Sequence, residues 1–173
     1  MRYLEAYQKV NDALEWLIAG VAGLLVLVIV ALPFVSAAVR YATGEGYTWL
    51  AELPPQLVPW VVFPLLGVVL RHDGHIAVDV LPHYLKGRRL TLLRAAVLGA
   101  CVIAAAAFAI FGVNTVLFFR QLGQMSTTEI EFPLWVLYLS YPLGFILAAN
   151  FALESLLREL GGKRRARHAP AAT

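Results

Sequence analysis

The chain alternates long apolar stretches with short polar segments. Four stretches contain no Asp, Glu, Lys or Arg, and they are 24, 18, 25 and 22 residues long: Trp16–Val39, Leu53–Leu70, Ala95–Phe119 and Phe132–Leu153. An α-helix rises about 1.5 Å per residue, so about 20 residues cross a bilayer core of about 30 Å. Three stretches clear this length, and the second reaches it when part of Tyr47–Glu52 is added. The pattern predicts an all-α integral membrane protein with four transmembrane helices.

We expect these spans at about residues 14–39, 50–70, 92–119 and 132–157. They form one membrane domain over residues 1–157, followed by a basic cytoplasmic tail over residues 158–173. Residues 2–15 lack Gly and Pro and are expected to continue as a helix into the first span. The first apolar stretch is much longer than the core of a secretory signal peptide, about 7–15 residues, so we expect it to remain uncleaved.

Proline is concentrated in the second span. Pro54 and Pro55 suit a first helical turn, whose amides are unpaired in any case. Pro59 and Pro64 lie further in and are expected to kink the helix or to unwind it locally. No Asp, Glu, Asn or Ser accompanies this break within the span, so we interpret it as a feature of shape, not an ion site.

The composition agrees with a membrane protein. Sixty per cent of the residues are apolar or aromatic, 14 per cent are charged, and the mean hydropathy is +0.72. A soluble helical bundle of this length would need more charge to cover its surface. The single cysteine, Cys101, excludes an intrachain disulfide.

The distribution of positive charge predicts the orientation. Lys and Arg accumulate on the cytoplasmic side of membrane proteins. With both termini and the segment between the second and third spans inside, twelve positive residues are cytoplasmic, and only Arg40 and Arg120 are outside. We therefore expect both termini in the cytoplasm, and Glu45, Glu52, Glu129 and Glu131 outside or at the outer boundary.

The segment Arg71–Arg89 is basic and holds three of the four histidines. We interpret it as an amphipathic connector in the cytoplasmic interface, next to lipid phosphates. His72 and His75 could also suggest a metal site, but basic surroundings oppose a cation and we expect no metal. An unpaired Asp79 would be costly there, and a structural ion pair with Arg71, Arg88 or Arg94 is our hypothesis.

The predicted spans contain few groups that could carry chemistry. Glu15 is the deepest acidic residue expected, at the cytoplasmic boundary, and Asn114 is interpreted as contact between helices. We expect no enzyme activity, no cofactor and no nucleic-acid partner. A membrane enzyme, an autonomous small transporter and a haem-carrying anchor are rivals, and each would need polar or histidine groups in the membrane. The residues favour a structural or partner-binding membrane subunit.

Several motifs in order resemble the DctQ-like small membrane subunit of TRAP transporters, from about Tyr7 to Leu157. The match consists of Arg40-Tyr41, Trp49 with Glu52, Arg71-x-x-Gly74-His75-Ile76-x-Val78-Asp79-x-Leu81, Gly123, and Pro133-x-Trp135-x-x-Tyr138-x-x-x-Pro142-x-Gly144-Phe145. Leu50-Ala51 stands before Glu52, where the family commonly has a second acidic residue.

The resemblance implies a role within a larger assembly. The partners would be a large multispan membrane subunit, which carries the sodium and solute sites and moves as an elevator, and a periplasmic solute-binding protein. The solute would be an organic acid. The small subunit would enlarge the static scaffold in the bacterial inner membrane, surrounded by lipid, and the motif residues are candidates for structural or partner contacts. The alternative is an anchor or assembly subunit of another membrane complex.

Overall fold

The computed structural model describes residues 2–72 and 88–160, and over these residues the protein is helical. The helices are α1 (Arg2–Thr43), α2 (Trp49–Arg71), α3 (Arg88–Leu122), α4 (Leu134–Tyr138) and α5 (Ser140–Leu160). Four helical segments are long and apolar enough to cross a membrane, α4 and α5 counting as one. The predicted all-α fold with four spans is confirmed; the predicted connector lies outside the described residues.

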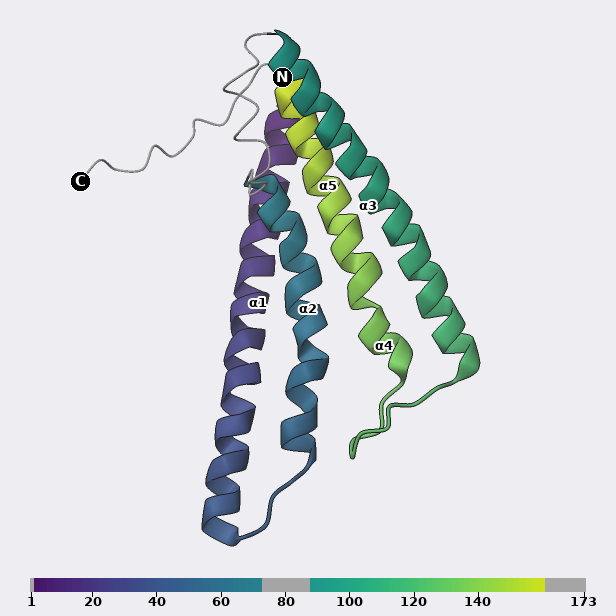
Figure 1. Ribbon diagram of the computed structural model, residues 1–173. Coiled ribbons are helices and arrows are strands. Elements are labelled where there is room, and N and C mark those ends of the chain that lie inside the picture. Colours follow the sequence, from purple (N-terminus) through teal and green to yellow (C-terminus); the bar gives the residue numbers. More distant parts are fainter. Residues whose placement is uncertain (1, 73–87, 161–173) are drawn as a thin grey trace, which may run out of the picture.

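The helices stand side by side in one layer (Figure 1). The order across the layer is α1, α2, α5 and α3, because α2 packs against α1 and α5, and α5 packs against α2 and α3. The short α4 continues the line of α5 and packs against α3. The helices α1 and α3 therefore form the two edges, each with a wide face that no other described helix covers.

The helices extend further than the apolar stretches alone. α1 begins at Arg2, as expected for residues 2–15, and it continues to Thr43, so Arg40 lies in its last turn. α2 begins at Trp49, close to the expected start of the second span at about residue 50, and α3 continues past Arg120 to Leu122. The connections at this end of the layer are residues 44–48 and 123–133, which we call the loop end. At 42 residues, or about 60 Å, α1 is much longer than a bilayer core.

The second span runs as one helix from Trp49 to Arg71 with all four prolines inside it. The expected local unwinding at Pro59 and Pro64 is therefore wrong. Proline removes a backbone hydrogen bond, but packing against helices on both sides can hold the remaining bonds in place. The interruption occurs instead in the fourth span, at Leu139 between α4 and α5.

Three glycines let α5 approach its neighbours closely. A Cβ on Gly144 would lie 2.4 Å from the Cβ of Phe63, and one on Gly67 would lie 2.9 Å from the backbone nitrogen of Ala148. On the other side of α5, a Cβ on Gly112 would lie 3.1 Å from Pro142. Small residues at helix contacts are the usual means by which membrane helices pack, since lipid supplies no hydrophobic drive between them.

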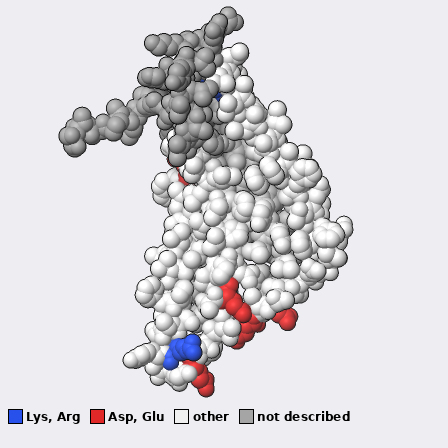
Figure 2. All heavy atoms as spheres, in the orientation of Figure 1, with Lys and Arg blue, Asp and Glu red and all other residues white. Residues whose placement is uncertain are grey.

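Charged side chains are unevenly distributed over the face shown in Figure 2. Acidic side chains gather at the loop end, and the middle of the face shown is free of charged side chains. This distribution fits a slab that crosses a bilayer, because charges are costly within the hydrocarbon region.

Candidate functional site

Arg71 lies at the centre of a buried polar cluster at the end of the layer opposite the loop end. Its guanidinium, fully buried, donates to Asp12 at 2.5 Å, to Glu15, and to Glu154 at 3.1 Å, and also reaches the Asn11 carbonyl at 3.3 Å. We call these residues, together with Asn150, Tyr7, His72 and Arg158, the Arg71 cluster. The cluster joins α1, α2 and α5.

Glu154 receives more donors than any other side chain in the Arg71 cluster. Both of its oxygens face Arg71: Oε2 lies 3.0 Å from Nε, outside hydrogen-bond geometry, and Oε1 accepts from a terminal nitrogen. Oε2 also accepts from Asn11 at 2.8 Å, and Arg158 pairs with Oε1. The carboxylate is completely buried. Charged donors of this kind offset the cost of removing a carboxylate from water.

A chain of hydrogen bonds continues from Glu154 toward the start of α1. The Asn11 side-chain oxygen accepts from Asn150 at 2.9 Å, and the Asn150 oxygen accepts from the Tyr7 hydroxyl at 2.6 Å. Every donor in this chain therefore points toward Glu154. The result is that α1 and α5, which have few backbone contacts with each other, are tied together through side chains.

The helical repeat explains how these groups converge. Tyr7, Asn11 and Glu15 are spaced four apart, and so are Asn150, Glu154 and Arg158. Residues four apart share one face of an α-helix, so each helix presents a polar ladder. Arg71, in the last turn of α2, reaches between the two ladders. The two ladders were a signal that sequence reasoning could have used.

The Arg71 cluster is closed within the chain. Three carboxylates, of Asp12, Glu15 and Glu154, surround two guanidiniums. His72, whose side chain is 47 % exposed, contacts Glu15 at 2.5 Å. The Arg71 guanidinium also lies over the ring of Phe151, 5.5 Å from its centroid. This arrangement suits a structural clamp, because the buried charges are already paired with one another.

A second polar contact joins the two connections at the loop end. The Trp49 amide donates to the Glu129 carboxylate at 2.9 Å, and the Glu129 amide donates to the Glu52 carboxylate at 2.9 Å. A carboxylate at a helix start satisfies an amide that has no partner within the helix. These reciprocal bonds fix the 123–133 connection against the start of α2.

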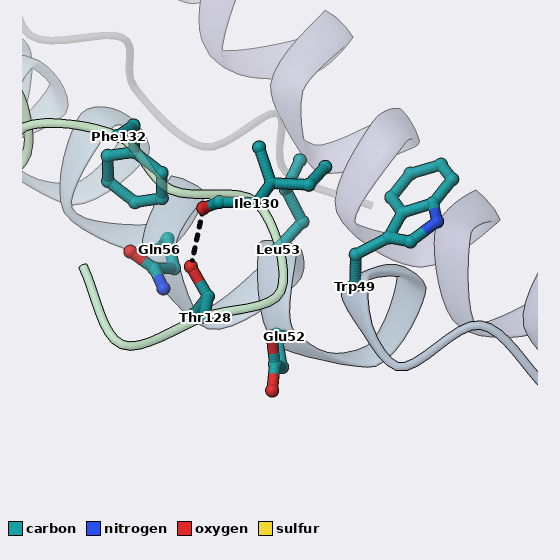
Figure 3. A pocket seen from close by; sticks show the side chains of 7 residues that line it. All are labelled: Trp49, Glu52, Leu53, Gln56, Thr128, Ile130 and Phe132. Carbon is teal, nitrogen blue, oxygen red and sulfur yellow. Dashed lines mark hydrogen bonds between the residues drawn. The ribbon is translucent and has the colours of Figure 1, made fainter. Parts of the chain in front are cut away.

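A shallow hollow, open to solvent, lies beside this contact (Figure 3). Phe132 and Gln56 lie on one side of it and Trp49 on the other, while the Thr128 hydroxyl donates to the Ile130 carbonyl at 2.8 Å. Thr128 thus satisfies a loop carbonyl instead of pointing a free hydroxyl at a ligand. The hollow belongs to the loop end, not to the Arg71 cluster.

The structure places the motif residues of the fourth span at contacts between elements. Pro133 precedes α4 and its backbone bridges to Met125. Tyr138 stacks on Phe119 of α3 with ring centroids 4.2 Å apart, and Arg120 lies over Trp135, 5.9 Å from its ring centroid. Pro142 contacts Gly112 and Gly144 contacts Phe63, as described above.

The other motif residues fall into three groups. Trp49 and Glu52 meet Glu129, and Gly123 ends α3 with a positive φ of 60°, a conformation that favours glycine. The Arg40 carbonyl accepts from the Gly44 amide. Gly74, His75 and Asp79 lie outside the described residues, so the ion pair proposed for Asp79 cannot be placed.

The structure shows the surroundings of three charged residues, Glu15, Glu154 and Arg71. Among the residues whose side chains are described, Glu154 has a completely buried carboxylate, whereas the Glu15 side chain is 22 % exposed. Arg71, proposed as a partner of Asp79, is engaged by Asp12, Glu15 and Glu154. Glu154 was missed because the fourth charge-free stretch ends one residue before it, and its partners Asn11 and Arg71 are more than eighty positions away in the chain.

A row of apolar helices, fastened by an internal ion cluster at one end, defines a multi-pass membrane subunit. The comparison with known protein families identifies which kind of membrane subunit it is. The sequence model of "Tripartite ATP-independent periplasmic transporters, DctQ component" matches residues 29–162, and the chain belongs to this family. The chain is thus a small component of a TRAP transporter.

A curated relative is the uncharacterized protein y4mM of Sinorhizobium fredii (strain NBRC 101917 / NGR234). It is 28 % identical over 127 residues, which are 72 % of this chain and 23 % of the relative. The chain therefore spans about a quarter of the length of the curated relative it matches. No solved structure matches the chain significantly.

Proposed function

We propose that this chain is the static scaffold subunit of a TRAP transporter in the bacterial inner membrane. In this proposal it supports a large sodium-coupled subunit that moves as an elevator, and it forms part of the surface on which a periplasmic solute-binding protein docks. The transported solute is an organic acid. Both termini are cytoplasmic.

The observation that carries the scaffold role is the closed Arg71 cluster. Its guanidinium is bonded to three carboxylates of the same chain, on two different helices, and its side chain is fully buried. Breaking such a pair by removing one partner leaves an uncompensated buried charge and costs about 3–5 kcal/mol. A group held this firmly fixes helix positions, which is what a static frame beside a moving subunit requires.

The length of the relative supports a large partner. In that protein the matched segment accounts for 23 % of the length, so about three quarters of its chain lies outside the segment. A unit that occurs as part of a longer polypeptide is suited to a fixed position beside the remainder. In our proposal the corresponding partner of this chain is a separate subunit.

The loop end supports the docking role. Its acidic residues Glu45, Glu52, Glu129 and Glu131 lie at the end that the charge distribution of the sequence assigns to the periplasm. The reciprocal bonds between Glu52, Glu129 and Trp49 hold this surface in one shape. A preformed surface loses less conformational entropy when it binds a partner.

The test is reconstitution of the two membrane subunits in liposomes with a solute-binding protein. We expect sodium-dependent uptake of an organic acid when all components are present, and none from liposomes that hold this chain alone. The chain should co-purify with the large subunit in mild detergent. Uptake by this chain alone would overturn the scaffold role.

A further inference from the structure

The outward face of α3 carries a side-chain amide that no described residue of the chain satisfies. Asn114 is exposed, and its side chain makes no hydrogen bond to any residue in 6–72 or 91–160, where side chains are described. It lies nine residues after the buried Ala105, and nine residues are about two and a half helical turns. Asn114 therefore points directly away from α5.

Asn114 lies within the apolar part of α3. The charged residues that flank this part are Arg94 and Arg120, and Asn114 precedes Arg120 by six residues, about 9 Å of helix rise. An asparagine side chain is too short to bring its amide over that distance to the interface. The residues around it on the same face are large, apolar and exposed: Ile103, Ile110, Phe111, Leu117 and Phe118.

Two comparisons within the chain show that this amide is unusual. The neighbouring Thr115 is also exposed, but its hydroxyl donates to the Phe111 carbonyl of its own helix at 2.9 Å. On the opposite edge of the layer, α1 has no amide or hydroxyl side chain from Leu17 to Val35. Lipid tails can cover the α1 edge, whereas they provide no hydrogen-bond partner for the amide of Asn114.

We propose that the α3 face around Asn114 is the surface that docks on the large transporter subunit. The occupant is a membrane helix of that subunit with a small residue that admits close approach and a polar group that bonds the Asn114 amide. Side-chain amides join membrane helices in this way, and large apolar residues around them supply the packing. The identity of this partner helix rests on the proposed function. Its polar group is inferred from the Asn114 amide, which needs a hydrogen-bond partner.

Photocrosslinking in the co-expressed complex tests the position of the face. Benzoylphenylalanine replaces Phe111 on α3, which is 66 % exposed, or Phe34 on α1, which is 74 % exposed, as the matched control. We expect an adduct with the large subunit from position 111 and little or none from position 34. An adduct between two copies of this chain, or an adduct from position 34 alone, overturns the assignment.

Substitution of the amide tests the chemistry. Asn114→Leu should weaken association with the large subunit about three- to twentyfold, the range measured for hydrogen bonds between membrane helices. Thr115→Val, which removes a hydroxyl bonded within its own helix, should leave association unchanged. The thermal unfolding of the chain alone should be the same in both variants. Equal retention of the large subunit by Asn114→Leu and Thr115→Val contradicts the proposed bond.

The proposed function and this inference fail in different ways. If the native chain does not retain the large subunit at all, the proposed function is wrong. The assignment of the large subunit as the partner of the α3 face is then wrong as well. If the native chain retains the large subunit but position 111 gives no adduct, only the α3 face is wrong.

Discussion

Arg71 of α2 and Glu154 of α5 face each other with two nitrogen–oxygen contacts, at 3.0 and 3.1 Å. Both side chains are fully buried, and they lie 83 positions apart in the chain. Two-point contact between a guanidinium and a carboxylate fixes orientation as well as distance. The pair therefore sets the position of α5 against the end of α2.

The first prediction concerns this pair. Glu154→Leu removes the buried acceptor and leaves Arg71 with only the exposed Asp12 and the partly exposed Glu15, so we expect a loss of about 3 kcal/mol in unfolding free energy. For a chain of this size the midpoint of thermal unfolding should fall by about 6–12 °C. Scanning calorimetry or a fluorescence melt in detergent measures this shift.

Two further variants show which property of Glu154 matters. Glu154→Gln keeps a hydrogen-bond acceptor but has no charge. Its unfolding free energy should lie between those of the native chain and of Glu154→Leu. The exposed Glu131→Gln is the control, expected within about 0.5 kcal/mol of the native chain. A Glu154→Leu chain as stable as the control would show that the cluster does not hold the helices together.

The second prediction concerns Gly144, where α5 meets α2. An added methyl group would lie 2.4 Å from Phe63 Cβ and 2.5 Å from its carbonyl carbon, which is backbone and cannot rotate away. Gly144→Ala should therefore destabilise the chain by about 1–3 kcal/mol, measured by the same melt. Gly99→Ala is the matched control, because a Cβ there meets nothing within 4 Å and alanine favours the helix by about 0.5–1 kcal/mol. Equal melting of the two variants would contradict the close contact.

The sequence alone predicts the four spans because the repeat of apolar residues is a local property. The extension of α1 to Arg2 follows from neighbouring residues in the same way. The contact of Glu154 with Asn11, 143 positions away, is not local. Nothing in a single sequence states that the ladder on α1 faces the ladder on α5, since this depends on the order of the helices in the layer. The outward position of Asn114 is missing from the sequence for the same reason.

The third prediction concerns the loop end. Glu129→Ala removes the acceptor of the Trp49 amide, a change that resembles loss of a helix cap and costs about 1 kcal/mol. We expect amide hydrogen exchange in the first turn of α2 to become about fivefold faster, since local opening follows the lost free energy. Glu131→Ala, two residues along the same connection, should leave exchange in this turn unchanged. Unchanged exchange in both variants would show that the Glu129 carboxylate does not hold the start of α2.

The last prediction concerns orientation, for which the charge distribution of the sequence is the basis. In a Cys101→Ala background, single cysteines replace Gly46 and Gln124 at the loop end or Leu160 at the end of α5, all of them exposed positions. A thiol reagent that cannot cross the membrane should label positions 46 and 124 in intact cells. It should label position 160 only after the membrane is opened. Because the structure places both connections at one end of the layer and the end of α5 at the other, positions 46 and 124 must behave alike. Labelling of position 160 in intact cells, without labelling of the other two, would reverse the orientation and would move the acidic loop end to the cytoplasm, where no periplasmic protein could dock on it.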